Sequence, residues 1–517
     1  MMAKVFSSAL YGVEGYIVEV EVDVSSGLPD LQIVGLPNKA VREAKERVRS
    51  ALKNCGFEYP VRRVTVNLAP AYRRKEGPHF DLPIALGILL ATGQVPGGAL
   101  EGKVVVGELS LDGIIRPVCG VLPMAATVKK EGFEAFVVPG PNGPEAAAVG
   151  EFKIECFDSL VKLVRWLRSP EDNEGLAPRV HRGSRPGLLS RGKRGDLALD
   201  YSDIKGQSVA KRALEVAAAG GHNVLLVGPP GSGKTMLAKR IPTILPPLTH
   251  HEALEVTVVH SVAGLLPPGQ GLMQTRPFRA PHHTVSVAAM TGGGTEPRPG
   301  EISLAHRGVL YLDEFPEYRR ETLEVLRGPL EDGQVTISRV RETVSYPACF
   351  TLVASMNPCP CGWSGDPERA CRCSVDDLRR YQRKLSGPLL DRIDIHVEVP
   401  RVPYSDLDSP VVSETSAEIR ARVVAARKIQ ADRYADTGFE ANAELNRRLL
   451  SRFCRPGPSG RALLRAAFSE LKLSMRAHDR ILKVARTIAD LAESPGITEE
   501  HVAEAIQYRS LDRRMEW

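Results

Sequence analysis

The spacing of apolar residues changes along the 517-residue chain, and each change marks a different architecture. Residues 1–168 mix runs of alternating apolar positions, such as GYIVEVEVDV, with runs of helical spacing, which is an α+β pattern. From 201 to 400, short apolar runs typical of buried strands alternate with helices. This pattern predicts an α/β domain, a parallel sheet with helices on both faces. Over 401–517 apolar residues stand three and four apart, which predicts a helical domain.

Residues 169–200 follow neither period. The segment is rich in Gly, Pro and Arg, which predicts a flexible linker. Its basic side chains could contact nucleic acid or only keep a tether solvated, and both alternatives stay open. These residues are Arg179, Arg182, Arg185, Arg191, Lys193 and Arg194.

Composition favours a soluble, globular protein with two or three domains. Hydrophobic residues make up 43% of the chain and charged residues 25%. The net charge of +6 is compatible with a polyanionic partner but does not identify one. We find neither a secretory signal nor an apolar stretch long enough to span a bilayer, so we expect a cytoplasmic protein without a membrane partner.

The strongest chemical signal is GPPGSGKT, which follows the apolar run NVLLV and opens a helix. This strand, loop and helix context is what the phosphate-binding pattern G-x-x-x-x-G-K-[ST] requires. The backbone N–H groups of the loop would surround a phosphate, the lysine would reach the β and γ oxygens of ATP or GTP, and the threonine hydroxyl would bind Mg²⁺. The eight residues are Gly228, Pro229, Pro230, Gly231, Ser232, Gly233, Lys234 and Thr235.

A second apolar strand, in RGVLYLDEF, ends about eighty residues later in Asp313 and Glu314. Asp313 fits a role at Mg²⁺, and Glu314 fits the polarisation of the attacking water. In isolation the two acids could be surface residues that follow a strand. Together with the phosphate loop, they predict a nucleotide-hydrolysing site.

Four of the nine cysteines fall within 359–373, in the pattern C-x-C-x₉-C-x-C. In a reducing compartment such clustering favours metal ligands over disulfides, and four thiolates are enough for a closed zinc site. An iron–sulfur cluster, a redox disulfide or unliganded thiols remain alternatives. Because the surrounding segment is too small for a core of its own, we expect a metal to brace a loop near the ATP site or a ring face. The candidate ligands are Cys359, Cys361, Cys371 and Cys373.

These motifs resemble the AAA+ ATPases, with an αβα core and a C-terminal helical lid. FRAPHHTVS, LAHRGVLYLDE and NPCPCG narrow the resemblance to the magnesium-chelatase-like branch. Within that branch, essentially the whole chain is similar to the YifB or ComM family, bacterial proteins implicated as ring-forming DNA motors in natural transformation. The resemblance implies ATP and Mg²⁺ as the nucleotide and its metal.

The resemblance also implies roles for three further residues. Asn357 falls at sensor 1, which positions water against the γ-phosphate, although an Asn before Pro is also an ordinary turn residue. Arg392 matches the arginine finger of a neighbouring subunit, or alternatively pairs with Asp391 or Asp394. Arg476 resembles sensor 2 on the lid. An arginine supplied in trans implies an oligomer, which we expect to be a homohexameric ring.

Two segments are candidates for gripping a DNA strand. LEDGQVTISRVRETVSYP predicts a hairpin, or a tight turn into one, with Arg339 and Arg341 on one strand face, where related motors project hairpins into the ring channel. His282 and His283 lie in a Gly-rich segment that suggests a mobile loop. With no third ligand apparent, we do not interpret these histidines as a metal site.

The segments VRRVTVNLAPAYRRKEGPHFDL and GVLPMAATVKKEGFEAFVVP resemble the proteolytic domain of Lon proteases. The resemblance implies that residues 1–168 form a Lon-like domain, with a fold like domain 2 of ribosomal protein S5. Where that pattern has its nucleophilic serine this chain has His79, and Leu122 stands where the catalytic lysine is expected. Peptide hydrolysis by that dyad is therefore excluded, and the domain is expected to serve as a scaffold or binding surface. Arg73, Arg74 and Lys75 form a candidate phosphate-contact patch, or simply a solvated loop.

The leading hypothesis is an ATP-driven, ring-forming DNA translocase or helicase. It would promote branch migration in homologous recombination or natural transformation, with single-stranded or branched DNA and recombination proteins as candidate partners. One alternative is the ATPase subunit of magnesium chelatase, although that subunit normally lacks a Lon-like domain and a cysteine cluster. Another alternative is a protein-remodelling ATPase.

Overall fold

The computed structural model describes residues 1–169, 179–182, 199–294, 297–338, 343–366, 368–403, 413–471 and 473–509. The chain forms two compact units. Unit 1 contains residues 1–190, 249–274 and 340–346, and unit 2 contains the remainder. Residues 249–274, which fall within the range expected for the ATPase core, thus group with unit 1. None of the helices in the described part of the chain is long and apolar enough to cross a membrane.

Unit 1 is built on an eight-stranded mixed sheet in the order β10-β9-β8-β5-β1-β2-β4-β3. The strands of this sheet are β1 (Met2–Tyr11), β2 (Glu14–Ser25), β3 (Asp30–Val34), β4 (Arg63–Ala69), β5 (Lys103–Val105), β8 (Ala135–Pro139), β9 (Lys153–Phe157) and β10 (Arg179–Arg182). The helices of the unit are α1 (Lys39–Asn54), α2 (Asp81–Ala91), α3 (Val121–Lys130), α4 (Gly143–Ala147), α5 (Leu160–Arg168) and α8 (His250–Val262). A small hairpin pairs β6 (Glu108–Leu109) with β7 (Ile115–Arg116).

Apolar side chains that alternate along the strands of this sheet point to opposite faces, and each face packs against a separate hydrophobic core. On β1, Val5 and Ala9 enter a core shared with α1, α2 and α5. Phe6 and Leu10, each one residue further along β1, pack against a second core that contains residues of α3. The α+β prediction for this region is therefore confirmed at the level of its elements.

The predicted linker, residues 169–200, contains one short strand. Within 169–200, Arg179–Arg182 forms β10, which pairs with β9 in antiparallel register. A four-residue edge strand is too short to give a period of its own, which explains why the sequence did not indicate it. Arg185, Arg191, Lys193 and Arg194 lie outside the described residues.

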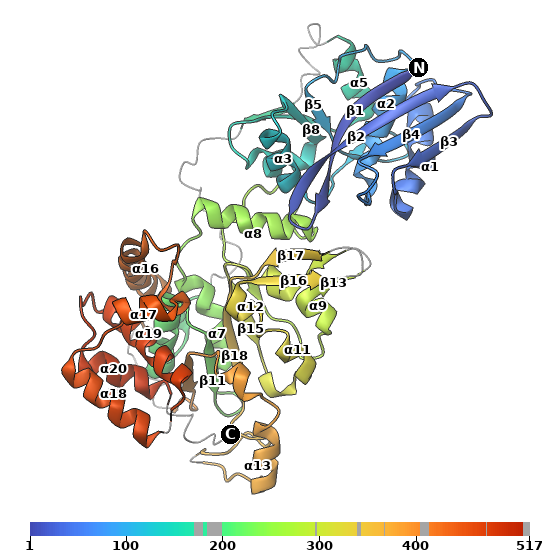
Figure 1. Ribbon diagram of the computed structural model, residues 1–517. Coiled ribbons are helices and arrows are strands. Elements are labelled where there is room, and N and C mark those ends of the chain that lie inside the picture. Colours follow the sequence, from blue (N-terminus) through green and yellow to red (C-terminus); the bar gives the residue numbers. More distant parts are fainter. Residues whose placement is uncertain are drawn as a thin grey trace. The chain divides into compact units, whose positions relative to one another are not determined.

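Unit 2 contains a five-stranded parallel sheet in the order β12-β15-β18-β11-β19, of which β15, β18 and β11 are labelled in Figure 1. Its strands are β12 (Phe278–Arg279), β15 (Val309–Leu312), β18 (Thr351–Met356), β11 (Val224–Val227) and β19 (Ile395–Glu398). The residues of β11 alternate between two cores: Val224 and Leu226 face one, and Leu225 and Val227 face the other. The predicted parallel sheet, buried on both faces, is confirmed.

The other elements of unit 2 surround this sheet and extend beyond it. They include α6 (Ser208–Gly220), α7 (Lys234–Ile244), α9 (Val287–Thr291), α10 (Glu301–Leu304), α11 (Arg320–Glu324), α12 (Pro329–Asp332), α13 (Val375–Gln382) and α14 (Gly387–Leu390), with the short strands β13 (Gly292–Gly293) and β14 (Arg298–Pro299). Asp332 ends α12, and Gly333 caps it with a φ of 65° just before β16 (Gln334–Ser338). Strand β16 pairs with β17 (Thr343–Pro347), of which residues 343–346 group with unit 1, so the expected hairpin is present and Asp332-Gly333 is the turn into it.

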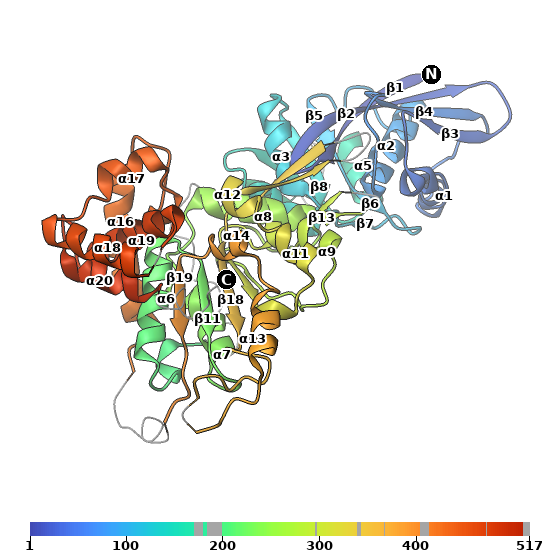
Figure 2. The same cartoon turned by 60° about the horizontal axis from the view of Figure 1, so that its bottom comes forward.

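The predicted C-terminal helices are also present. They are α16 (Ser416–Tyr434), α17 (Arg447–Phe453), α18 (Pro458–Glu470), α19 (Met475–Leu491) and α20 (Glu499–Gln507). Figure 2 shows them gathered beside the sheet, with α6 and β19 nearest to them. Buried residues of α16 and α19 share one core with α6 and β11, so this helical domain and the sheet form a continuous packed body.

Candidate functional site

The phosphate loop joins the end of β11 to the start of α7. Gly231 and Gly233 have φ values of 78° and 92°, in the left-handed region that favours glycine. The loop therefore turns sharply into the amino end of α7, where the free N–H groups and the helix dipole favour an anion. The Lys234 ammonium is largely buried and donates to the carbonyls of Gly228 at 2.6 Å and Pro229 at 2.9 Å. Burial lowers the pKa of Lys234, an effect that the nearby Asp313 carboxylate opposes.

The Asp313 carboxylate faces the first turn of α7. Its Oδ2 accepts a hydrogen bond from the Thr235 hydroxyl at 2.9 Å, and its Oδ1 accepts from the Ser355 hydroxyl. Burial alone would favour the protonated acid, but these donors hold the pKa of Asp313 below its usual value. Hydroxyl and carboxylate oxygens are the ligands that Mg²⁺ prefers, so Thr235 and Asp313 fit a magnesium site.

Two residues of this network were not anticipated from the sequence. Ser355, completely buried in β18, and Tyr311 of β15 share a hydrogen bond of 2.9 Å. The Tyr311 hydroxyl oxygen also lies 3.3 Å from the Thr235 hydroxyl oxygen, and burial raises the pKa of Tyr311 to about 12. A serine in an otherwise apolar central strand was the available signal, because a buried hydroxyl needs a partner.

Glu314 adopts an unusual backbone conformation for a residue with a side chain. Its φ is 51°, and its side chain is 61% exposed. The Glu314 Oε2 lies 3.3 Å from Nδ1 of His283, an ion pair when the imidazole is protonated. His283, for which the sequence suggested no role, therefore lies beside the candidate catalytic carboxylate.

Asn357 follows β18 and completes the group around the lysine. Its Oδ1 lies 3.3 Å from the Lys234 ammonium, and its carbonyl accepts from the Tyr381 hydroxyl at 3.2 Å. The structure thus brings together Lys234, Thr235, Asp313, Glu314 and Asn357, which the sequence had proposed from three separate segments.

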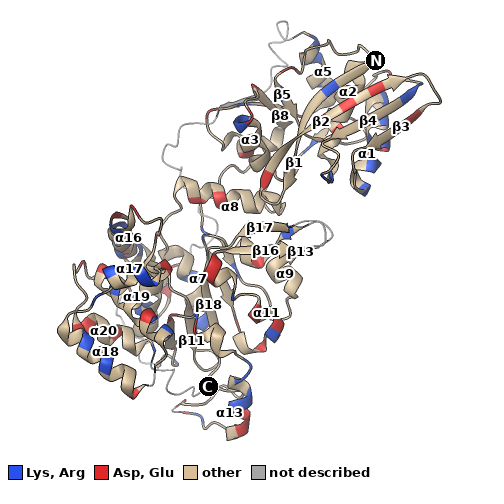
Figure 3. Ribbon diagram, viewed as in Figure 1, with Lys and Arg blue, Asp and Glu red and all other residues tan. Residues whose placement is uncertain are grey.

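Two cavities adjoin this group, and both lie within unit 2. The strand-end cavity, of about 440 Å³, is lined by Lys234, Asp313, Glu314 and Asn357 together with basic residues of the α13 region, Arg380 and Lys384. Figure 3 shows that α13 carries charges of both signs. The loop-side cavity, of about 420 Å³, lies against residues 230–233 and includes Gln207, Met236 and Arg401. The two cavities thus adjoin different residues of the phosphate loop, Lys234 in one case and residues 230–233 in the other.

The two predicted arginines lie away from these cavities. Arg392 is buried and forms an ion pair with Glu331, not with Asp391 or Asp394. Its Nε makes no hydrogen bond to any described residue. The side chain of Arg476 is 63% exposed and lies 3.4 Å from the carboxylate of Asp391, the residue that precedes Arg392. Neither arginine is among the described residues that line the two cavities.

The four clustered cysteines converge. Their Sγ atoms all lie within 4.8 Å of one another, and three of the pairs are at 3.4, 3.6 and 3.7 Å. Sulfurs about 2.3 Å from a tetrahedral zinc would be about 3.8 Å apart, so the donor set and its spacing fit that metal. Backbone hydrogen bonds lower the pKa of Cys361 to about 6, whereas burial raises the pKa of Cys359, so it is the spacing of the sulfurs that supports a metal.

The candidate DNA contacts are only partly described. Arg339 and Arg341 lie outside the described residues. In unit 1, Lys75 does not belong to a surface patch, since it is fully buried and its ammonium donates to the carbonyls of Pro70 and Arg73. That part of the prediction is wrong, because a lysine can turn inward where main-chain carbonyls satisfy it. Arg74 is 60% exposed on its side chain.

The positions compared with a peptidase dyad offer no such chemistry here. His79 and Leu122 are both buried, and burial lowers the pKa of His79 to about 4. The Leu122 backbone N–H donates to the Glu145 carboxylate at 3.0 Å. Both residues therefore serve the packing of unit 1.

Comparison with known proteins identifies the family. Three family models match: "Subunit ChlI of Mg-chelatase" over 20–142, "Magnesium chelatase, subunit ChlI" over 200–407, and "Magnesium chelatase, subunit ChlI C-terminal" over 413–509. An uncharacterized protein of Mycobacterium tuberculosis is 45% identical over 99% of both chains. The competence protein ComM of Haemophilus influenzae is 44% identical over 100% of this chain and 99% of its own. The uncharacterized protein YifB of Escherichia coli is 43% identical over 99% of this chain and 98% of its own. Relatives this similar over their full length establish that the chain belongs to the YifB/ComM family of magnesium-chelatase-like proteins.

Proposed function

We propose that this protein hydrolyses ATP to drive movement along branched or single-stranded DNA. The observation that carries the ATPase part is the meeting of Lys234, Thr235, Asp313, Glu314 and Asn357 at the carboxyl edge of a parallel sheet. Such an edge is where ligands bind in open α/β folds. Membership in a family of magnesium-chelatase-like ATPases supports the same assignment.

Each residue has a distinct task in hydrolysis. The Lys234 ammonium, which donates to main-chain carbonyls in this structure, would reach the β and γ oxygens of the nucleotide. Thr235 and Asp313 would hold Mg²⁺, which when bound neutralises charge on those oxygens. Glu314 would orient the attacking water and accept its proton, with His283 keeping the carboxylate in position. Asn357, within reach of Lys234, would hold the water against the γ-phosphate.

The DNA part is supported by a relative and by a surface of unit 1. The Haemophilus influenzae relative is a competence protein by name. On unit 1, the Arg73 guanidinium lies 4.8 Å from the ring centroid of Tyr16, 5.4 Å from that of Tyr11 and 5.8 Å from that of Tyr72. Tyr72 is 78% exposed. Exposed aromatic rings beside arginines stack bases and contact phosphates without regard to sequence.

The decisive experiment measures ATP turnover and unwinding of a synthetic four-way junction. We expect wild type to unwind the junction and to hydrolyse ATP faster when DNA is present. Glu314→Gln should still bind ATP but lose about 10²-fold or more in turnover, and all unwinding with it, because the general base is gone.

Tyr72→Ala should weaken binding of single-stranded DNA, whereas Val61→Ala, an exposed apolar control, should not.

Two other outcomes would select a different function. Turnover indifferent to every DNA but raised by a porphyrin-binding partner would favour the magnesium-chelatase subunit. Turnover raised only by a protein client would favour a remodelling ATPase. Either result would overturn the DNA assignment while leaving the ATPase site intact.

A further inference from the structure

The cysteine segment lies directly against the phosphate loop. Gly362, between the first and second cysteine pairs, has a φ of 86°. A Cβ at this position would lie 2.7 Å from Cδ of Pro230, which belongs to the phosphate loop. Since proline cannot move aside as a flexible side chain can, only glycine allows this approach. The cysteine segment therefore forms one wall of the phosphate loop.

A stack of side chains joins the same segment to the loop-side cavity. The guanidinium carbons of Arg369 and Arg401 each lie 4.5 Å from the ring centroid of Trp363. Arg401 also lies 3.7 Å from the carboxylates of Asp366 and Glu368. Of the two arginines, Arg401 is the one that lines the loop-side cavity. The stack thus fixes the direction of a cationic side chain at that cavity.

The segment also reaches the strand-end cavity. Pro360, between Cys359 and Cys361, is part of its lining. Cys359 itself is completely buried, whereas Cys371 is exposed. A segment this short contributes little apolar core of its own, so bonds from the four sulfurs to one metal would hold its two ends together.

We infer that zinc bound by Cys359, Cys361, Cys371 and Cys373 holds the phosphate loop and Arg401 in the geometry that binds nucleotide. The metal acts through position, since Gly362 supports Pro230 and Trp363 orients Arg401. Loss of zinc by chelation therefore lowers nucleotide affinity without any change in the phosphate-loop residues. The inference rests on the proposed function in one respect, namely that this site binds ATP.

The first test removes the metal. The full chain carrying Cys371→Ser and Cys373→Ser is compared with Cys349→Ser, an exposed cysteine outside the cluster. Zinc content is measured by mass spectrometry, and affinity is measured with a fluorescent ATP analogue. We expect about one zinc per chain in wild type and control. The double variant should lack zinc and bind the analogue at least about tenfold more weakly, a factor that corresponds to about 1.4 kcal/mol.

The second test keeps all four cysteines. Arg401→Lys preserves the charge at the loop-side cavity but loses the planar stack on Trp363. Arg369→Lys makes the matched change on a stacking partner that does not line the cavity. We expect normal zinc in both variants and a severalfold loss of affinity only for Arg401→Lys. If the double cysteine variant does not fold, zinc is stripped from wild type by a chelator and then restored, and affinity should fall and recover.

The possible results separate the two proposals. Zinc-free protein that binds the ATP analogue as tightly as wild type would overturn the inference and leave the ATPase proposal standing. Failure of zinc to co-purify or to rebind would also overturn it. Wild type that carries zinc but binds no ATP analogue would overturn the proposed function instead.

Discussion

At the scale of single residues, Glu314 shows how the site places its chemistry. A left-handed φ in a residue with a Cβ costs on the order of 1 kcal/mol, so the surrounding structure must maintain it. The Glu314 backbone N–H donates to Oδ1 of Asp313 at 3.0 Å, whereas the Glu314 carboxylate lies beside His283. Two adjacent acids thereby point to different partners, which suits one for a metal and the other for a water.

His79 leads to a prediction about pH. Its imidazole is 7% exposed, and its Nε2 makes no hydrogen bond to any described residue. Burial lowers the pKa from 6.5 to about 4, so the folded chain keeps this ring neutral where the unfolded chain would protonate it. As pH falls from 6.5 toward 4, protonation of this residue in the unfolded chain therefore lowers the free energy of unfolding by about 3 kcal/mol.

The measurement is urea unfolding of the full chain between pH 7.5 and 4. His79→Leu should show a smaller decline in stability over this range than wild type. His251→Leu replaces a histidine whose side chain is 79% exposed and should decline as wild type does. Equal declines in all three proteins would show that His79 does not resist protonation.

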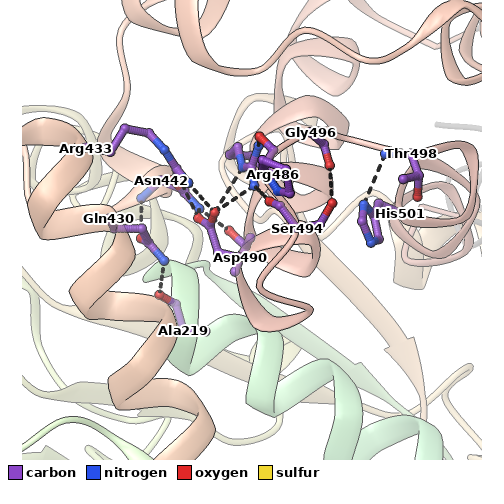
Figure 4. A network of polar contacts seen from close by, with 12 residues as sticks. Ala219, Gln430, Arg433, Asn442, Arg486, Asp490, Ser494, Gly496, Thr498 and His501 are labelled. Atoms are coloured by element: carbon purple, nitrogen blue, oxygen red, sulfur yellow. Dashed lines mark hydrogen bonds and ion pairs between the residues drawn. The ribbon is translucent and has the colours of Figure 1, made fainter.

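At the scale of elements, a buried polar network connects the C-terminal helices (Figure 4). Asp490 of α19, 1% exposed, accepts hydrogen bonds from Arg433 of α16, from Arg486 and from Asn442. Gln430 of α16 extends the network by donating to the Ala219 carbonyl of α6 at 3.0 Å. Burial of apolar faces drives these helices to pack, and the polar network sets their register relative to one another.

Removing Asp490 should therefore destabilise the helical domain. Asp490→Ala would leave the buried Arg486 without its carboxylate, at a cost of about 3–5 kcal/mol. Asp432→Ala, at an exposed position of α16, should change stability by less than about 0.5 kcal/mol. Chemical unfolding followed by circular dichroism compares the two. A small effect of Asp490→Ala would mean that apolar packing alone sets the register.

At the scale of the whole molecule, the proposed ring predicts that two inactive variants can rescue each other. Lys234→Ala lacks nucleotide binding but keeps Arg392, and Arg392→Ala has the opposite defect. If Arg392 acts in a neighbouring subunit, each variant alone should lose roughly 10³-fold in turnover, and a mixture should exceed the sum of its parts.

Mixing Lys234→Ala with Glu314→Gln is the matched control. Neither of those variants has an intact site that a neighbour could complete, so no rescue is expected. ATP turnover of mixtures at several ratios gives the answer. An absence of rescue in demonstrably mixed oligomers would restrict Arg392 to its ion pair with Glu331 in the same chain.

Local motifs and element types could be read from the sequence because neighbouring residues define them. The phosphate loop is one continuous turn, the parallel strands are short apolar runs, and the four cysteines are close in the chain. The meeting of Asp313 with Lys234 was also expected, because an acidic pair after a strand accompanied the phosphate loop, and the position of Asn357 was implied by the family resemblance. Resemblance to a family supplied the roles of Arg392 and Arg476, which remain predictions.

Partnerships across the chain were decided only by the tertiary structure. The pairing of His283 with Glu314, the bridge from Ser355 to Asp313, the ion pair between Arg392 and Glu331, the inward turn of Lys75 and the stacking of Arg401 on Trp363 join segments with no shared periodicity. The physical reason is that hydrophobic periodicity records which face of an element is buried, whereas the partner of a polar side chain depends on where the folded backbone brings a second group within about 3 Å.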